Sequence, residues 1–205
     1  MLKYNYFNNF KNILNLDVIE RINIRFHFCC YRMTRINIET IRSLGVINNN
    51  LLNTWADACS VLLDFRSHKS PVKFVIDGPI KAETTLDWTS IANKTGYEDL
   101  EQTAEFAGYG MGLLIVTTFE KLVPVGRRAK GDGVDIICAK AAKDDDNFLS
   151  TSTEDYYIEG KGSRNQSAVK KHLTAGIKQS QRASGNVYVI STEFETPSAL
   201  THFRK

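Results

Sequence analysis

The chain has 205 residues, of which 42% are hydrophobic and 24% are charged, and its formal net charge is +3. These values are typical of a folded globular protein and exclude a chain that is disordered throughout. The longest apolar stretches, such as 111–116, are far shorter than the ~20 residues that cross a bilayer, so we predict no membrane span. The N-terminal segment lacks the apolar core and the cleavage site of a signal peptide, and we therefore expect a cytoplasmic protein.

The four cysteines indicate free thiols. They form no CxxC pair, and their spacing to the four histidines matches neither a zinc site nor a disulfide framework. We expect Cys59 and Cys138 to be buried, and we expect Trp55 and Trp88 to anchor a core or an interface.

Residues 1–32 differ in composition from the rest of the chain. They are rich in Asn, Ile, Phe and Tyr, and a more conventional sequence begins at Met33. One interpretation is that 1–32 is an upstream segment and that Met33 is the natural start. The other is a true N-terminal helix, because apolar residues recur there at helical spacing, at Phe10, Ile13, Leu14, Val18 and Ile22. Both interpretations stay open.

Residues 33–94 form an N-terminal helical and hairpin extension. A helix is predicted from Asn50, because apolar residues between 51 and 63 repeat every three or four positions and asparagines are available as caps. Ser70-Pro71 ends that pattern, 72–76 is typical of a short strand, and 77–79 of a turn. The sequence does not indicate a function for this extension.

A long helix follows at about 98–120, with acidic residues in its first turn, where the helix dipole favours negative charge. Gly108, Gly110 and Gly112 each cost roughly 1 kcal/mol relative to alanine in a helix. Their presence predicts that this helix packs closely against a sheet.

The remainder of the chain alternates strands and one helix. Strands are predicted at 123–128, 134–139 and 156–161, a basic amphipathic helix at 165–183, and a fourth strand at 187–191. The second strand is rich in β-branched residues and does not alternate with a polar face, so we expect it to be central. The polar segment 143–155 is predicted to be a surface connection. The resulting fold class is α/β, in the order helix-strand-strand-strand-helix-strand.

Two of these strands carry charged residues that point to metal chemistry. Glu159 and Lys161 are two positions apart and therefore share one face of a strand, together with Tyr157. If the second and third strands pair as a hairpin, Asp135 lies beside Glu159 on that face. Two carboxylates that converge repel each other unless a cation lies between them, and hard oxygen ligands suit Mg²⁺ or Mn²⁺. A neighbouring lysine can position water or stabilise charge on a phosphate.

This arrangement resembles the PD-(D/E)xK, or restriction-endonuclease-like, nuclease superfamily. The resemblance covers roughly Gly96 to Phe194 and implies a nuclease-like core at 95–205, a mixed sheet flanked by helices. The chain departs from the family pattern at two positions. Val134 precedes the aspartate where proline is common, and Gly160 stands where a β-branched residue is usual.

The resemblance also implies the role of each residue. Asp135 and Glu159 would hold Mg²⁺ or Mn²⁺ with the carbonyl of Gly160, and Lys161 would activate or position water. Many family members carry a further carboxylate on the preceding helix. Here Glu105 or Glu101 matches it, and we prefer Glu105, which lies well inside the helix.

The segment after the lysine favours nucleic-acid binding, because no acidic residue occurs between Lys161 and Arg182. We predict that Ser163 or Asn165 caps the helix and that His172 is a surface residue. Phosphate contacts are predicted at Arg164, Gln166, Lys170, Lys171 and Lys178.

The function expected from the sequence is a metal-dependent DNA nuclease, in restriction, phage defence or a mobile element, with RNA not excluded as a substrate. The alternative is a catalytically silent protein of the same fold that binds nucleic acid or a partner protein. Either protein could be a homodimer or a subunit of a larger complex.

Overall fold

The computed structural model describes residues 35–44, 47–128, 131–140 and 155–205. The chain divides after residue 32, and the second unit is Met33–Lys205. Both interpretations of segment 1–32, and nearly all of the connection predicted at 143–155, lie outside the described residues.

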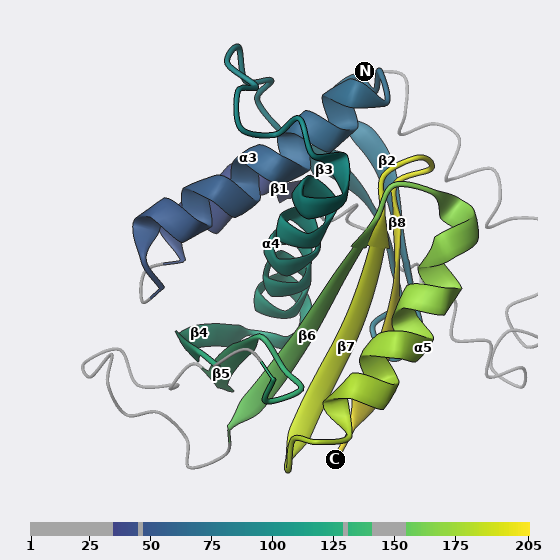
Figure 1. Cartoon of the computed structure of the whole chain (residues 1–205). Coiled ribbons are helices and arrows are strands. Elements are labelled where there is room, and N and C mark those ends of the chain that lie inside the picture. Colours follow the sequence, from purple (N-terminus) through teal and green to yellow (C-terminus); the bar gives the residue numbers. More distant parts are fainter. Residues whose placement is uncertain (1–34, 45–46, 129–130, 141–154) are drawn as a thin grey trace, which may run out of the picture. The chain divides into compact units, whose positions relative to one another are not determined.

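The second unit is built on one mixed sheet of eight strands, in the order β1-β3-β2-β8-β7-β6-β5-β4 (Figure 1). Neighbouring strands are parallel in the pairs β1–β3, β2–β8 and β6–β7, and antiparallel in the other four pairs. The strands are β1 (Arg35–Asn37), β2 (Val72–Asp77), β3 (Ala82–Asp87), β4 (Leu122–Arg127), β5 (Ile136–Lys140), β6 (Tyr156–Ser163), β7 (Asn186–Glu193) and β8 (Ser198–Arg204).

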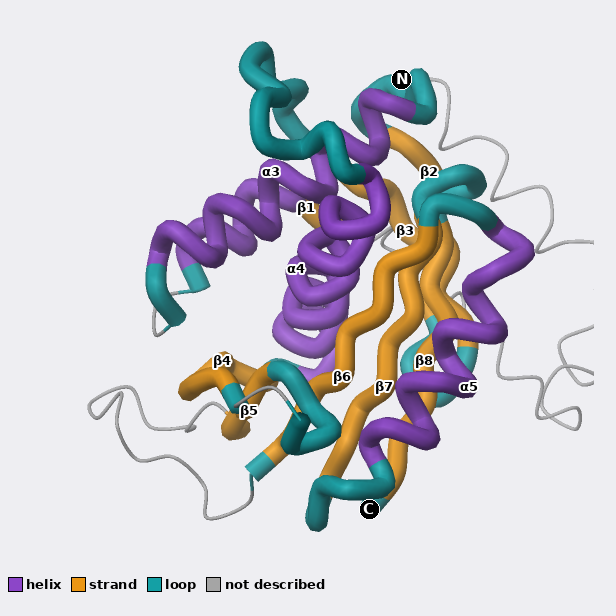
Figure 2. The backbone as a smooth tube through the Cα atoms, viewed as in Figure 1, coloured by secondary structure: helices purple, strands orange, loops and turns teal. Residues whose placement is uncertain are grey.

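Helices cover both faces of this sheet. Figure 2 shows the strands as one layer, with α4 (Leu100–Glu120) and α5 (Val169–Ser180) on its two sides. The helix α3 (Asn49–Phe65) packs against α4. Two short 3-10 helices, η1 (Ile38–Ser43) and η2 (Gln166–Ala168), precede α3 and α5. The protein is therefore an α/β protein with a mixed sheet between helices.

Side chains of the central strands alternate between two cores, as the period of two requires. Tyr156 and Ile158 of β6 belong to the large core under α3 and α4. Tyr157 belongs to a smaller core, in which Leu173 and Ile177 of α5 pack on the sheet. The predicted burial of Trp55, Trp88, Cys59 and Cys138 is confirmed.

The glycines of α4 do pack against the sheet. A Cβ atom on Gly108 would lie 2.2 Å from the backbone nitrogen of Gly162, and one on Gly162 would lie 1.6 Å from the carbonyl oxygen of Ala104. A Cβ on Gly160 would lie 2.7 Å from the carbonyl oxygen of Gly108. Only glycine fits at these positions, and this explains why position 160 carries no β-branched residue.

Several predicted elements are present with small shifts, and some were missed. The element order from α4 to β7 is the predicted one, and the hairpin of β2 and β3 lies in the segment predicted to contain it. The strands β1 and β8 were not predicted. Because β2 pairs with β8, the extension at 33–94 continues the same sheet as residues 95–205.

Two local predictions are wrong. The second strand, β5, is not central: it lies next to the edge strand β4, while β8 and β7 occupy the middle of the sheet. It is apolar because residues such as Ile136 and Cys138 pack under α4. Neither Ser163 nor Asn165 caps the following helix with its side chain, and the backbone N–H of Gln166 instead donates to Glu195 Oε2 at 3.1 Å.

Within the residues that the structure describes, no helix combines the length and the hydrophobicity that a membrane crossing requires.

Candidate functional site

The candidate site lies at the point where β5 stops pairing with β6. The strand β5 pairs only with residues 156–158 of β6, whereas β7 pairs with the whole strand from Tyr156 to Ser163. No other described strand continues along β6 beyond Ile158 on the β5 side. One edge of β6 is therefore left without a strand partner at the positions of Glu159 and Lys161.

Asp135 lies at this point, immediately before β5. Its backbone N–H donates to the carbonyl oxygen of Ile158 at 2.8 Å, which places Asp135 across from Glu159. Its Oδ2 accepts the backbone N–H of Gly160 at 3.1 Å. The carboxylate thus binds the first amide of β6 that lacks a strand partner, and this contact fixes the aspartate beside the glutamate.

Glu159 is fully buried and shares the α5 face with Lys161. Its Oε1 lies 2.5 Å from Lys161 Nζ, yet neither oxygen receives a well-aligned hydrogen bond from a described residue. Gly176 of α5 packs over both side chains, since a Cβ there would lie 3.4 Å from Glu159 Cγ and 3.5 Å from Lys161 Cγ. A buried carboxylate without hydrogen bonds is costly, because burial removes its contacts with water.

The two carboxyl groups perturb each other. Burial raises the pKa of Asp135 above its ordinary value, although the Gly160 N–H and Lys161 oppose the increase. Burial and the charge of Asp135 raise the pKa of Glu159 to about 8. At neutral pH the pair therefore retains a proton that a bound divalent cation would displace.

Lys161 is held from two sides. Besides Glu159, its ammonium donates to Gln179 Oε1 of α5 at 3.1 Å. These two contacts direct the ammonium along the edge of the sheet, next to the carboxylates.

Glu105 approaches the site from α4. It is close enough to Asp135 for its charge to raise the pKa of that carboxyl. The hydroxyl of Tyr109 donates to Glu105 Oε1 at 2.5 Å, and the Tyr109 ring packs against Trp55 with centroids 5.7 Å apart. Burial and the neighbouring carboxylates raise the pKa of Tyr109, so its hydroxyl remains a donor.

Glu101 has a different partner: it pairs with Arg164 at 3.0 Å. Glu105 therefore lies near Asp135, whereas Glu101 is engaged by Arg164.

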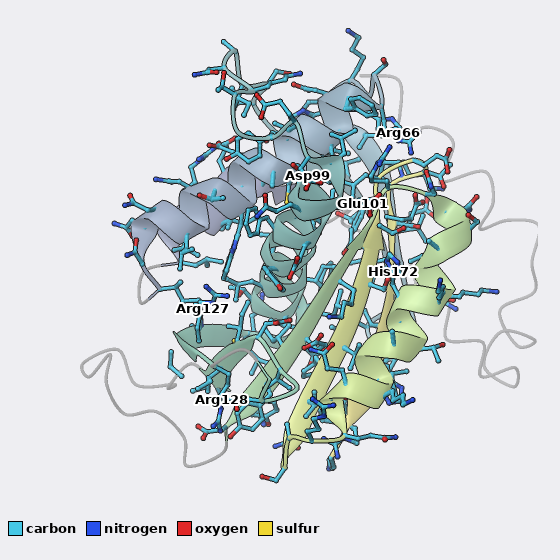
Figure 3. All side chains as sticks on the ribbon, viewed as in Figure 1. Arg66, Asp99, Glu101, Arg127, Arg128 and His172 are labelled. Atoms are coloured by element: carbon cyan, nitrogen blue, oxygen red, sulfur yellow. The ribbon has the colours of Figure 1, made fainter. Side chains whose placement is uncertain are left out.

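Of these groups, Glu105 and Lys161 line an open cleft of about 680 Å³ between α4 and α5. Figure 3 shows Asp99 and Glu101 at the N-terminal end of α4, and His172 on α5. The lining includes Glu105, Lys161, His172 and Ala175. His172 Nδ1 lies 3.1 Å from the carbonyl oxygen of Gly162. Because a carbonyl oxygen only accepts hydrogen bonds, Nδ1 must be the protonated nitrogen that donates in this contact. His172 is thus part of the cleft wall.

The donor set suits a hard divalent cation bound mainly through water. Asp135 and Glu159 supply two carboxylates, and among the described residues no group of three or more Asp, Glu, His or Cys side chains is placed to hold a metal ion. Mg²⁺ usually binds with one or two carboxylates and keeps several waters. In an extended strand the N–H and the carbonyl of one residue point to the same side. Since the Gly160 N–H faces Asp135, the Gly160 carbonyl faces that side too.

The comparisons with known proteins found no similarity. No protein-family model, no curated protein and no solved structure matches this chain. The site is therefore interpreted from its own geometry.

The structure brings Asp135, Glu159, Gly160 and Lys161 together, with Glu105 beside them. The residues predicted to contact phosphate differ in their exposure and in their partners. Arg164 is engaged by Glu101, and its carbonyl oxygen accepts a hydrogen bond at 2.5 Å from Arg66, which directly follows α3. Gln166 is exposed at the start of η2, and Lys170, Lys171 and Lys178 are exposed on α5.

Two residues at the site were missed in the sequence. Tyr109 follows Glu105 by four residues, which is the spacing of side chains that meet on one helix face, so the pair was detectable. Gln179 contacts Lys161 across 18 residues of sequence, and no local pattern signals such a contact.

Proposed function

We propose that this protein is a divalent-metal-dependent nuclease of the PD-(D/E)xK type that hydrolyses phosphodiester bonds in DNA. The observation that carries the proposal is the pairing of Asp135 with Glu159 at the open edge of β6, with Lys161 2.5 Å from the glutamate. Structural ion pairs are usually satisfied by hydrogen bonds, whereas Glu159 Oε1 has its 2.5 Å ion-pair contact with Lys161 and neither oxygen has a well-aligned hydrogen bond within the described part of the chain. A divalent cation would supply the further contacts that these oxygens lack.

In this proposal Asp135, Glu159 and the Gly160 carbonyl hold Mg²⁺ or Mn²⁺, which would polarise the phosphate and lower the pKa of a bound water. Lys161 positions the attacking water and stabilises charge that develops on the phosphate. Gln179 keeps the ammonium at the mouth of the cleft through its 3.1 Å contact. Glu105, fixed by Tyr109, adds a second carboxylate on the α4 side, where it can orient water.

The test is a cleavage assay on plasmid and single-stranded DNA with Mg²⁺ or Mn²⁺, and with EDTA as the metal-free control. Glu159→Gln should abolish cleavage, because the amide is a poor ligand for a hard cation. Glu83→Gln makes the same change on β3, where Glu83 forms an exposed ion pair with Lys73 at 2.7 Å, and should keep full activity. Equal activity in wild type and Glu159→Gln would exclude the proposed chemistry.

The same experiment addresses the alternative of a silent relative. A wild-type protein that binds DNA and never cleaves it with either metal would be a binding protein. Isothermal titration with Mn²⁺ then shows whether the carboxylate pair still holds a metal.

A further inference from the structure

Three adjoining clefts follow one side of α5. The cleft at Lys161 shares Ala175 with a second cleft of about 550 Å³, whose lining includes Lys178 and Gln179. The second cleft shares Gly131 and Arg182 with a third cleft of about 330 Å³. Because neighbouring clefts share walls, they form one continuous surface depression, which we call the α5 groove. Lys161 donates to Gln179 where the first two clefts meet.

Basic side chains follow the α5 wall of this groove. Lys178 and Arg182 line it. Lys171 precedes Ala175 by four residues and Lys178 by seven, so these three lie on one face of α5, and Arg182 follows just beyond the end of the helix. None of the three basic residues pairs with a carboxylate among the described residues. Their charges are therefore available to a ligand.

Lys170 lies on a different side of the same helix. It precedes Leu173 by three residues and Ile177 by seven, and both of these side chains pack toward the sheet. Lys170 is exposed on the flank of α5 away from the groove. The sequence placed Lys170 and Lys171 together, and the helix geometry separates them.

The two ends of the groove differ in charge. The α4 wall of the first cleft carries Asp99, Glu101 and Glu105. At the other end, Arg128 lies over the ring of Tyr157, donates to its hydroxyl at 3.2 Å and pairs with Asp132 at 3.9 Å. Arg182 completes this wall and carries no ion pair within the described residues, so the end keeps a net positive charge. A polyanion is attracted to the α5 side and to Arg128, and it is repelled by the α4 wall.

The length of the basic stripe suits a strand of nucleic acid. Residues 171 to 182 span eleven steps, which at about 1.5 Å per residue is about 16 Å. A nucleic-acid strand advances roughly 3.4 Å per phosphate in B-form, so the stripe matches about five phosphates.

We propose that the α5 groove binds the sugar-phosphate backbone of one nucleic-acid strand and leads it past Lys161. Lys171, Lys178, Arg182 and Arg128 hold the phosphates. The identification of the strand as the substrate rests on the proposed nuclease function, whereas binding in the groove is a separate property. Arg128 and Arg182 form the end farthest from the acidic wall.

The test compares Lys171→Ala with Lys170→Ala, which remove the same charge from adjacent exposed positions. Fluorescence anisotropy measures binding of a fluorescein-labelled single-stranded DNA 12-mer, with EDTA to prevent cleavage, at several salt concentrations. Lys171→Ala and Arg182→Ala should each weaken binding about three- to tenfold and lower the slope of log K against log salt by about 0.7. Lys170→Ala should keep the wild-type affinity, and thermal melting of every variant verifies its folding.

The outcomes separate the two proposals. Equal losses in Lys170→Ala and Lys171→Ala, or no loss in either, would overturn the groove, whether or not the protein cleaves DNA. The expected pattern of losses without cleavage in Mg²⁺ or Mn²⁺ would support the groove and overturn the nuclease. A wild-type protein with no affinity for the 12-mer would also overturn the groove.

Discussion

Replacing Gly108 with alanine should force α4 away from β6, whereas the same change at Gly112, four residues later on the same helix, should stabilise the protein. The added Cβ at position 108 would lie 2.2 Å from the backbone nitrogen of Gly162. The group that it meets is main chain, which cannot change rotamer. The Cβ at position 112 would make ordinary contacts, at 3.5 Å from Ile158 Cγ2 and 3.6 Å from Gly160 Cα.

The magnitudes follow from these contacts. Relieving the clash at Gly108 requires the helix and strand to separate by about 1 Å, and overpacking of this kind costs typically about 1–3 kcal/mol or more. Alanine recovers up to roughly 1 kcal/mol of helix propensity at either position. We therefore expect Gly108→Ala to lower the free energy of unfolding by about 2 kcal/mol, and Gly112→Ala to raise it by up to roughly 1 kcal/mol.

Urea unfolding followed by circular dichroism measures both variants against wild type. For a domain of this size, 2 kcal/mol corresponds to a decrease of about 4–8 °C in Tm. An unchanged or increased stability in Gly108→Ala would refute the close contact between α4 and β6. So would an equal shift in both variants, because only the surroundings of the two glycines differ.

Three further predictions concern the site. Burial and the charge of Asp135 raise the pKa of Glu159 in the folded protein to about 8, above its ordinary value of 4.5, so the native protein binds more protons than the unfolded chain between these pH values. Metal-free wild type therefore loses stability as pH rises through this range. Glu159→Gln removes this loss. In urea unfolding with EDTA, the free energy of unfolding of the variant should therefore rise relative to wild type from pH 5 to 8.5, by on the order of a few kcal/mol at most. Parallel curves of stability against pH would contradict this. Tyr109→Phe keeps the aromatic ring on Trp55 and removes the hydrogen bond to Glu105, so it should slow cleavage as much as Glu105→Gln does. The double variant should be no slower than either single variant, and additive losses would show that the two residues act independently. Lys161→Ala should abolish metal-dependent cleavage while folding and DNA affinity are largely kept, and full activity in a preparation free of contaminating nuclease would contradict the role of the lysine.

The sequence determined the parts of this protein that depend on short-range geometry. Apolar spacing located α3, α4 and α5 within a few residues, because a helix repeats every 3.6 residues wherever it packs. The alternation of a strand placed Glu159 and Lys161 on one face without knowledge of the neighbours. The glycines of α4 indicated a close approach, since they cost stability unless a backbone lies against them.

Tertiary structure decided the remainder. The sequence could not show that β5 begins only at Ile136 and leaves one edge of β6 without a strand partner, because strand order and register depend on contacts between distant segments. For the same reason β8, which joins the hairpin at 72–87 to the core, was missed. The separation of Lys170 from Lys171 depends on which face of α5 meets the sheet. Charge and spacing supplied the chemical groups of the site, and the packing of α4, α5 and β5 around one strand decided which of them meet.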